Sequence, residues 1–467
     1  MDLSPQAQSL AVIAVAVVIL WITEALPLAV TALLGAAACV LAGVAPAREA
    51  FAPFADPLIF LFIGSFILAE GIRLHRLDKR LAFAVLSLPG VGERPGRIRA
   101  AVAVVCMLAS GFLSNTCTTA MMLAIVSGII AAVEEASRRS GRPPAEGFAT
   151  GLLLCVAFAS SLGGLATPIG TPPNLIGLGF IRNQLGVEIS FPGWCAIGLP
   201  LVALLGTITV FVLGWMFPAG VSRLEGVRDF VAAERNRLGA WTTGQRSTAI
   251  AFAVTVMLWV VPGIVLVVLG PDDPTARLLK ARLPEGVAAL IGAGLMFILP
   301  GGEAGGPWRP VLRWTEARID WGIVLLYGGG MALGTLCFST GLATAVGESI
   351  QGLVPSGPAG PVVLVVLAAG VAVLTSEFTS NTASANIVVP VAIALGVATG
   401  GDPLVPALAA TFAASLGFMM PVSTPCNAIV YGTGRIPLRS MMAAGAVLDV
   451  AGVVAIAAAM LLLGRLS

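Results

Sequence analysis

Long apolar stretches, separated by short polar ones, run along the whole chain. A helix needs about 20 apolar residues to cross the hydrocarbon core of a bilayer, which is roughly 30 Å thick. About ten stretches have this character, although some are shorter. They are residues 7–25, 28–44, 58–71, 148–166, 193–217, 247–269, 286–299, 322–337, 404–420 and 441–463. The pattern predicts an all-α protein that crosses a membrane many times.

Composition supports this prediction. Of the 467 residues, 57% are apolar and 11% are charged, and the mean hydropathy is +0.97. A soluble domain carries about 25% charged residues, so a soluble surface cannot be built from this chain. Asp2 is the only charge before Glu24, and the apolar run that follows is long, which favours a membrane span over a cleaved leader. We expect a multi-pass protein of the inner (plasma) membrane.

The sequence does not indicate disulfide bonds, a zinc site or a nucleic-acid partner. The seven cysteines are isolated, without a CxxC pair, so neither a disulfide framework nor a zinc site is expected. The net charge of +2 gives no sign of nucleic-acid binding, and we expect no nucleic-acid partner.

A polar triplet, Ser-Asn-Thr, interrupts the apolar pattern twice. It occurs in "LSNTCTTAMM", residues 113–122, and in "TSNTASANIV", residues 379–388. The flanking apolar arms, residues 98–113 and 117–133 and then 361–374 and 383–397, are each about 14 to 17 residues, or roughly 21 to 26 Å as helix. Such arms are short for a full crossing but suit a hairpin that turns at membrane depth. We therefore predict two re-entrant hairpins.

A second element follows each triplet. "SLGGLATPIGTPPN", residues 161–174, and "SLGFMMPVSTPCN", residues 415–427, both begin Ser-Leu-Gly, pass a proline and end Thr-Pro-x-Asn. A lone triplet is more often a helix N-cap or an interhelical hydrogen bond, and a lone Thr-Pro-x-Asn more often a kink. Both elements appearing twice, in the same order, indicates an internal repeat and favours a functional site.

Basic residues predict how the chain lies in the membrane. If the ten spans cross and the hairpins return to the side they enter, twenty of the 26 Lys and Arg residues fall on one face: Arg73, Arg76, Lys79, Arg80, Arg94, Arg97, Arg99, Arg138, Arg139, Arg142, Arg223, Arg228, Arg235, Arg237, Arg246, Arg309, Arg313, Arg318, Arg435 and Arg439. Arg48, Arg182, Arg277, Lys280, Arg282 and Arg465 fall on the other. By the positive-inside rule the first face is cytoplasmic and both termini are outside. The two hairpins then enter from opposite sides, as an inverted repeat, which is the architecture of secondary transporters.

The helix ends at these breaks can bind ions of both signs. The second arm of each hairpin begins with free N–H groups, which suit an anion, and the first arm ends in free C=O groups, which suit a cation. Proline breaks the helix at each Thr-Pro-x-Asn element, where Gly170 and Ser423 leave carbonyls exposed. Two anion half-sites would suit a ligand with two carboxylates. The motifs contain no Lys, Arg or His, so bound cations would have to supply the positive field.

Three residues beside the motifs have further potential. Glu377 is an intramembrane carboxylate next to the second triplet; it could bind a proton or a cation, but a helix-end or hairpin-packing role is favoured. Cys117 and Cys426 adjoin the motifs, and we expect both to be accessible to thiol reagents.

At "SNTCTTAMM", "IGTPPN", "TSEFTSNTA" and "VSTPCNAIV" the chain resembles the divalent-anion/sodium symporter family, whose members carry dicarboxylates, citrate or sulfate. The resemblance extends over nearly the whole chain. It implies a homodimer in which a transport domain moves like an elevator against a scaffold domain. It also implies two or more Na⁺ sites. Well-described members are often drawn with eleven spans, against ten here, and often have proline at the position of Cys426.

The resemblance also implies site residues. The first Na⁺ site would be formed by Ser110, Ser114, Asn115 and Gly170, and the second by Ser376, Thr379, Asn381 and Ser423, partly through backbone carbonyls. The substrate carboxylates would be held by Asn115, Thr116 and Thr171 from one half and by Asn381, Thr382, Thr424 and Pro425 from the other.

The same resemblance divides the chain into four parts. Residues 1–96 would be scaffold helices with a first lateral arm at 74–86, and residues 97–220 the first hairpin and broken helix. Residues 221–358 would be scaffold helices with a second arm at 341–354, and residues 359–467 the second hairpin, broken helix and last helix.

Together these features predict Na⁺-coupled symport of C4-type dicarboxylates such as succinate, fumarate or malate. Na⁺-independent dicarboxylate exchange and a sulfate or citrate carrier of the same fold stay open. A membrane-embedded enzyme is disfavoured, because the chain has one His and no HExxH motif. An ion channel is also disfavoured, because inverted repeats with broken helices indicate alternating access.

Overall fold

The computed structural model describes residues 3–141, 146–270, 272–302 and 307–465. These residues form α-helices and four short 3-10 helices, and the only β-type pairing among them is an isolated bridge between Pro300 and Pro310. The prediction of an all-α protein is therefore confirmed.

Each of the ten predicted spans is a helix in the structure. They are α1 (Pro5–Thr23), α2 (Leu28–Leu41), α4 (Pro57–Leu74), α8 (Glu146–Gly163), α10 (Phe191–Met216), α12 (Thr243–Leu269), α14 (Glu285–Ile298), α15 (Trp321–Ser339), α19 (Leu404–Ala413) and α21 (Leu438–Leu463). By length and composition, 10 described helices could cross a membrane. That set contains three hairpin arms in place of α2, α14 and α19, which are shorter. The multi-pass architecture is confirmed, although length alone does not separate spans from hairpin arms.

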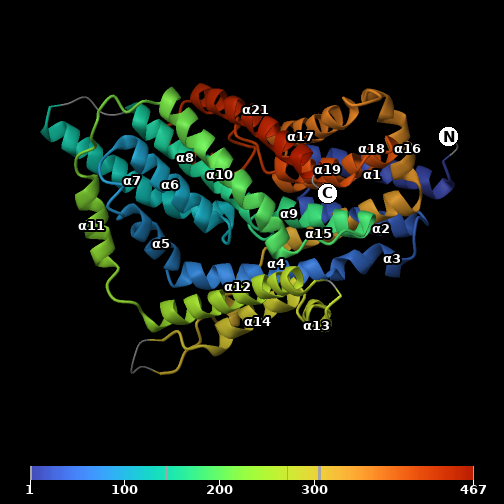
Figure 1. Cartoon of the computed structure of the whole chain (residues 1–467), viewed down its shortest axis with the longest axis horizontal. Helices are drawn as coiled ribbons and strands as arrows, with labels where there is room; N and C mark the ends of the chain where they lie inside the picture. The colour runs from blue at the N-terminus through green and yellow to red at the C-terminus, as the bar shows by residue number, and fades with distance from the viewer. Residues whose placement is uncertain (1–2, 142–145, 271, 303–306, 466–467) are drawn as a thin grey trace.

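The two triplets lie at the turns of two helical hairpins. The first consists of α6 (Pro95–Ser110) and α7 (Asn115–Arg139), and the second of α17 (Gly360–Phe378) and α18 (Asn381–Ala398). Figure 1 shows the first hairpin in the left half of the molecule and the second in the right half. With 25 residues, α7 is longer than the predicted arm, because its charged last turns continue the helix beyond the apolar stretch.

A broken helix follows each hairpin. In the first half α8 runs into η2 (Gly164–Ala166) and then into irregular backbone before α9 (Pro172–Leu185). In the second half α19 ends seven residues before the predicted limit of 420, and α20 (Pro425–Tyr431) follows after another irregular segment. Proline is the first residue of both α9 and α20, where a missing N–H costs no helical hydrogen bond.

The remaining helices are short. They are α3 (Ala47–Phe51), α5 (Leu77–Leu86), α11 (Val227–Arg237), α13 (Pro274–Arg282), α16 (Leu342–Ile350), η1 (Ala52–Ala55), η3 (Trp314–Glu316) and η4 (Gln351–Leu353). α5 and α16 fall within the two predicted lateral arms. In Figure 1, α5 and α11, from the predicted cytoplasmic face, lie at the left-hand end, and α3, from the other face, lies at the right-hand end. Arg142 lies outside the described residues.

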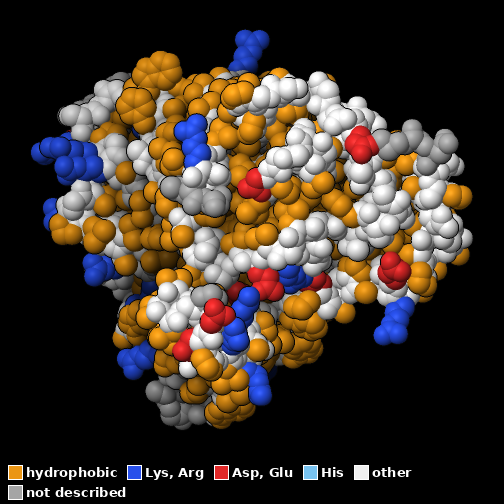
Figure 2. Space-filling view, turned by 45° about the vertical axis from the view of Figure 1, so that its right-hand side comes forward, with side chains coloured by type: hydrophobic (Ala, Val, Ile, Leu, Met, Phe, Trp, Pro, Cys, Tyr) orange, Lys and Arg blue, Asp and Glu red, His pale blue; other side chains and the backbone are white. Residues whose placement is uncertain are grey.

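The surface is that of a membrane protein. Figure 2 shows a face covered mostly by hydrophobic side chains, with charged ones gathered in small groups. The apolar helix α12 is only 17% buried within the chain over its most apolar window. Its exposed side chains, such as Met257, Ile264 and Val267, are suited to lipid.

Small residues let the helices approach closely, as is common in membranes. α4 packs on α14 through Gly64. A Cβ atom added at Gly64 would lie 2.6 Å from the Cβ and 2.7 Å from the carbonyl carbon of Ala289, so the two backbones touch.

Gly64→Val is therefore expected to destabilise the protein by about 1–3 kcal/mol, because the added side chain forces α4 and α14 apart. The measurement is the thermal unfolding midpoint of the detergent-purified protein. The matched control is Gly294→Val on α14, where an added Cβ meets no atom within 4 Å. Equal midpoints for the two variants would contradict the close packing at Gly64.

Candidate functional site

The two hairpin turns face one cavity. Its volume is about 940 Å³, and it is lined by the first triplet with Cys117, by the second triplet, and by both irregular segments of the broken helices. All seven residues predicted to bind substrate line it: Asn115, Thr116, Thr171, Asn381, Thr382, Thr424 and Pro425. Segments far apart in the sequence therefore contribute to a single chamber.

Helix N-termini point their free N–H groups toward this cavity. Ser114 is the N-cap of α7 and accepts a hydrogen bond from the Cys117 N–H at 3.2 Å. Ser380 is the N-cap of α18 and accepts one from the Ala383 N–H at 3.1 Å. The N-cap interpretation of a single triplet thus holds for both serines. The Asn and Thr that follow each serine begin the helix at its positive end, which suits an anion.

In the first half, oxygen atoms gather around Asn115. Its Oδ1 lies 2.6 Å from the Ser110 hydroxyl oxygen, and the same amide position faces the carbonyl oxygens of Ser160 at 3.2 Å and Gly170 at 3.3 Å. If the amide turned over, its NH₂ group would donate to these oxygens instead. The turned orientation satisfies all of these atoms in the absence of a cation. With the amide oxygen inward, the hydroxyl, amide and carbonyl oxygens would form a ligand set for a hard cation.

Three of the four residues predicted for the first cation site thus lie together. Ser110 is fully buried behind the cavity, and Asn115 and Gly170 line it. Ser114 is exposed at the turn, where its hydroxyl caps α7. The Ser160 carbonyl was missed from the sequence, because a backbone oxygen has no side-chain signature.

The second half has a related arrangement with different partners. The Ser376 hydroxyl oxygen lies 2.7 Å from Asn381 Oδ1 and 3.0 Å from the Ala414 carbonyl oxygen, so either can accept its single hydrogen. The Asn381 amide donates to the Ser415 carbonyl at 3.4 Å. Ser376 and Asn381 are thus brought together in the same way as Ser110 and Asn115.

The other two residues predicted for the second cation site have their hydroxyls engaged elsewhere. Thr379 donates to the Thr375 carbonyl at 2.8 Å. Ser423 donates to the Glu377 carboxylate at 2.6 Å and to the Glu377 carbonyl at 3.0 Å. Donating the hydrogen leaves lone pairs on both hydroxyl oxygens, so these oxygens and the backbone carbonyls of the two residues can contribute to a cation site.

The asparagine of each Thr-Pro-x-Asn element holds its helix break closed. Asn174 Nδ2 donates to the carbonyls of Gly164 and Thr167, both at 2.8 Å. Asn427 Nδ2 donates to the carbonyls of Gly417 and Met420, both at 2.9 Å. The sequence offsets are 10 and 7 residues in both halves. These matching hydrogen bonds support the internal repeat. In the sequence, only the matching position of the asparagine in the two Thr-Pro-x-Asn elements indicated them.

Charged residues also line the cavity, which the sequence motifs alone did not indicate. Arg73 pairs with Glu70, with Nε 2.9 Å from Oε2, and Arg318 Nε lies 3.9 Å from the same carboxylate. Asp78 lies beside them, and burial raises the pKa of its carboxyl group. Arginine is therefore present at the edge of the chamber, although not in the motifs.

The two cysteines beside the motifs differ. Cys117 is exposed at the cavity, as predicted, whereas Cys426 is only 1% exposed. The expectation that Cys426 is accessible is wrong for this conformation, because α20 turns its side chain into the protein.

Comparison with known proteins identifies the family. The family described as "sodium:sulfate symporter transmembrane region" matches this chain over residues 1–466. The chain belongs to this symporter family. It is therefore a multi-pass membrane transporter rather than an enzyme, and the resemblance read from its motifs is confirmed.

Relatives of this symporter support the assignment. The sodium-dependent dicarboxylate transporter SdcS of Staphylococcus saprophyticus is 31% identical over 428 residues, which is 91% of this chain and 80% of that one. The protein of the same name from Staphylococcus aureus is 30% identical over the same shares.

Two solved structures share the fold. The YdaH transporter of Alcanivorax borkumensis has a TM-score of 0.54 and 15% identity, over 89% of this chain and 86% of its own. MtrF of Neisseria gonorrhoeae has a TM-score of 0.57 and 14% identity, over 88% and 81%. At this identity the likeness concerns the fold alone.

We expect Asn115→Ala and Asn381→Ala each to abolish transport by this symporter while leaving it folded, because each substitution removes an amide shared by the cavity and a buried serine. The measurements are solute uptake into proteoliposomes and the thermal unfolding midpoint. Asn236→Ala is the control, since Asn236 is exposed on α11 and does not line the cavity. Uptake at the wild-type rate in either variant would show that the triplets have only a structural role.

Proposed function

We propose that this symporter couples the inward movement of Na⁺ to uptake of C4-type dicarboxylates such as succinate, fumarate or malate. The observation that carries the proposal is that two related half-sites, each with a helix N-terminus and a nearby group of oxygens, face one cavity. The relatives named as sodium-dependent dicarboxylate transporters support both the ion and the substrate class.

Each half of the cavity binds one carboxylate in this proposal. Asn115, Thr116 and Thr171 hold one group, and the second half holds the other through Asn381, Thr382, Thr424 and Pro425. Neutral amide, hydroxyl and N–H donors satisfy the carboxylate oxygens. Na⁺ ions at the Ser110–Asn115 and Ser376–Asn381 groups offset the charge of the dianion.

Sulfate is the second candidate, because the family description names it. A cavity of about 940 Å³ with a half-site on each side favours a longer ligand that has two separate anionic groups. A compact anion would contact one half-site at a time.

Uptake of radiolabelled succinate into proteoliposomes tests the proposal. An inward Na⁺ gradient is expected to drive accumulation above the equilibrium level, and replacing Na⁺ by choline is expected to remove it. Uptake without Na⁺ that internal dicarboxylate stimulates would point to an exchanger. Na⁺-driven sulfate uptake that excess succinate does not inhibit would favour the sulfate carrier.

The way in which the cavity is bounded supports an elevator mechanism as part of the proposal. The proposed transport domain comprises residues 97–220 and 359–467, and the proposed scaffold comprises residues 1–96 and 221–358. Glu70, Arg73 and Arg318 at the cavity edge belong to the scaffold and to the predicted cytoplasmic face. The conformation described is therefore open to the cytoplasm in this proposal.

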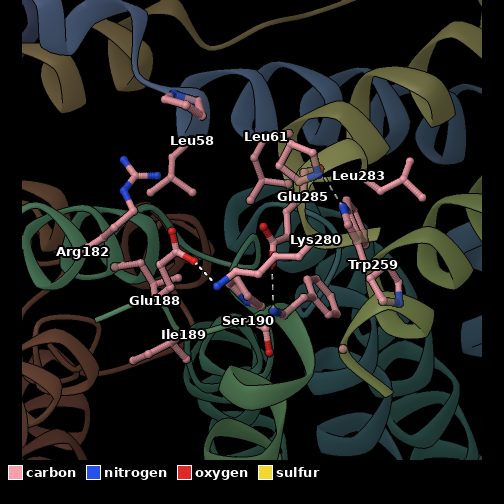
Figure 3. Close-up of a pocket in the computed structure, with 18 of the residues that line it drawn as sticks. Leu58, Leu61, Arg182, Glu188, Ile189, Ser190, Trp259, Lys280, Leu283 and Glu285 are labelled. Carbon is pink, nitrogen blue, oxygen red and sulfur yellow. Dashed lines mark hydrogen bonds and ion pairs between the residues drawn. The ribbon is translucent and has the colours of Figure 1, made fainter. Parts of the chain in front are cut away.

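A second cavity, of about 340 Å³, lies between the proposed domains. Figure 3 shows Arg182 and Glu188, from the transport domain, facing it together with Lys280, from the scaffold. Arg182 pairs with Asp56, and Lys280 Nζ lies 2.7 Å from Glu188 Oε2. Arg182 and Lys280 belong to the predicted external face, so these two external ion pairs hold the domains together on the side opposite the main cavity.

Breaking the external ion pairs is expected to shift the population toward the outward-open state. The double substitution Arg182→Gln with Lys280→Gln removes two partly exposed pairs worth together about 1 kcal/mol, or roughly a fivefold change in population. The measurement is labelling of Cys117, as the only remaining cysteine, by an impermeant thiol reagent in vesicles of each orientation.

Labelling from the cytoplasmic side should fall and labelling from outside should rise. The control is Arg237→Gln, which removes an ion pair with Glu234 within the single helix α11. Unchanged labelling in the double variant would mean that the pairs do not bias the two states.

The homodimer is part of the same proposal. The exposed apolar surface of the scaffold helix α12 provides area for a second copy as well as for lipid.

A further inference from the structure

The last helix contains a buried carboxyl group without a basic partner. Asp449 lies in α21 and is 5% exposed. Neither of its oxygens has a hydrogen-bond partner of good geometry among the described residues, and the groups nearest to them are the Glu377 carboxyl and the Phe418 backbone. A charge removed from water without a compensating partner is strongly unfavourable. An ionisable residue of this kind inside a membrane span is a functional candidate by default.

Asp449 faces a second buried carboxylate, that of Glu377. Glu377 accepts hydrogen bonds from the N–H groups of Met419 at 2.8 Å and Met420 at 3.0 Å, and from the Ser423 hydroxyl at 2.6 Å. Of the helix-end and hairpin-packing roles favoured from the sequence, this is the packing role, because the carboxylate joins the end of α17 to irregular backbone of the broken helix. Two ionised carboxylates are acceptors only, so a proton or a metal cation must lie between the two side chains for them to interact favourably.

Close packing forces this contact. A Cβ atom added at Gly445 of α21 would lie 2.4 Å from the Phe418 carbonyl carbon and 2.5 Å from Met419 N. α21 therefore runs directly against the broken segment, and Asp449, one turn further along α21, is directed at Glu377. A larger residue at Gly445 would move the two carboxylates apart.

The described residues offer no basic counter-charge here, since none of the ion pairs among them includes Glu377 or Asp449. The first half shows that the repeat does not need the pair. Gly111 follows Ser110 where Glu377 follows Ser376. Gly198 of α10 contacts its broken helix at Leu165 as Gly445 does at Phe418, and Val202 stands four residues later.

We propose that Glu377 and Asp449 bind a Na⁺ ion between them, at a cation site separate from the Ser110–Asn115 and Ser376–Asn381 groups. The inference rests on the proposed Na⁺ coupling. Carboxylate oxygens are hard ligands that suit a hard cation, and the ion supplies the positive charge that the pair lacks.

The site is connected to the substrate cavity through Ser423. Its hydroxyl is bound to Glu377, and both Ser423 and the adjacent Thr424 line the cavity. Na⁺ at Asp449 fixes Glu377, and Glu377 in turn fixes the segment Met419–Ser423. The ion therefore orders the half-site that holds one carboxylate, so that it binds before the substrate.

Equilibrium binding of radioactive Na⁺ to the detergent-purified full chain tests the site. Asp449→Asn and Asp449→Ser are expected to bind about one Na⁺ fewer per chain at saturation than the wild type. Both variants lose a buried unpaired charge, so their unfolding midpoint in Na⁺-free buffer should be no lower than that of the wild type. Added Na⁺ should raise the midpoint of the wild type more than that of either variant.

Glu135→Gln, at the exposed end of α7, is the control and should bind the wild-type number of ions. An unchanged number of bound Na⁺ ions in both Asp449 variants overturns the inference. So does a result in which the variants lose binding of Ca²⁺ or Mg²⁺ but keep the wild-type number of Na⁺ ions. An unchanged count together with loss of the pH dependence of uptake would show that the pair shares a proton instead. The number of bound ions is measured without transport, so the two proposals are tested separately. Succinate uptake by the wild type that does not depend on Na⁺ would refute the proposed coupling.

Discussion

Everything in this structure depends on how backbone groups are satisfied where helices stop inside the protein. An unpaired N–H or C=O group costs several kcal/mol in apolar surroundings, so a helix cannot end there without partners. Asn174 and Asn427 supply some of them by donating two hydrogen bonds each to carbonyls of the backbone that follows α8 and α19. The carbonyl side of each break is thereby fixed, and the N–H side opens on the cavity.

This constraint also explains which small residues the breaks require. A Cβ atom added at Gly170 would lie 2.5 Å from the Gly164 carbonyl oxygen. The two backbone segments of the first break can therefore lie this close together only if residue 170 has no side chain. The same approach brings the Gly170 carbonyl to Asn115. One close contact therefore closes the break and completes the oxygen group, and the fold and the candidate site cannot be separated at this point.

The sequence predicted what depends on local pattern and missed what depends on long-range approach. Apolar length located the ten spans, and duplicated motifs located the residues that line the cavity. The end of α19 was placed too late, because its apolar composition continues through Leu416–Met420 although the backbone has left the helix. The carbonyls of Ser160 and Ala414, the arginines at the cavity edge and the burial of Cys426 depend on contacts between distant segments, which a single sequence does not report.

The two halves share a backbone but differ in charge, and this difference has a consequence for binding order. Around Asn115 the oxygens belong to neutral groups, whereas the second half adds the carboxylates of Glu377 and Asp449. Coulomb attraction is stronger in a poorly hydrated interior than in water, so the second half attracts a cation before any substrate is present. At the site proposed above, a dianion therefore binds the second half only after cations have offset the negative charge there. The proposed Glu377–Asp449 site thus assigns the first cation-binding step to the second half, and the neutral first half would bind a carboxylate with less dependence on it.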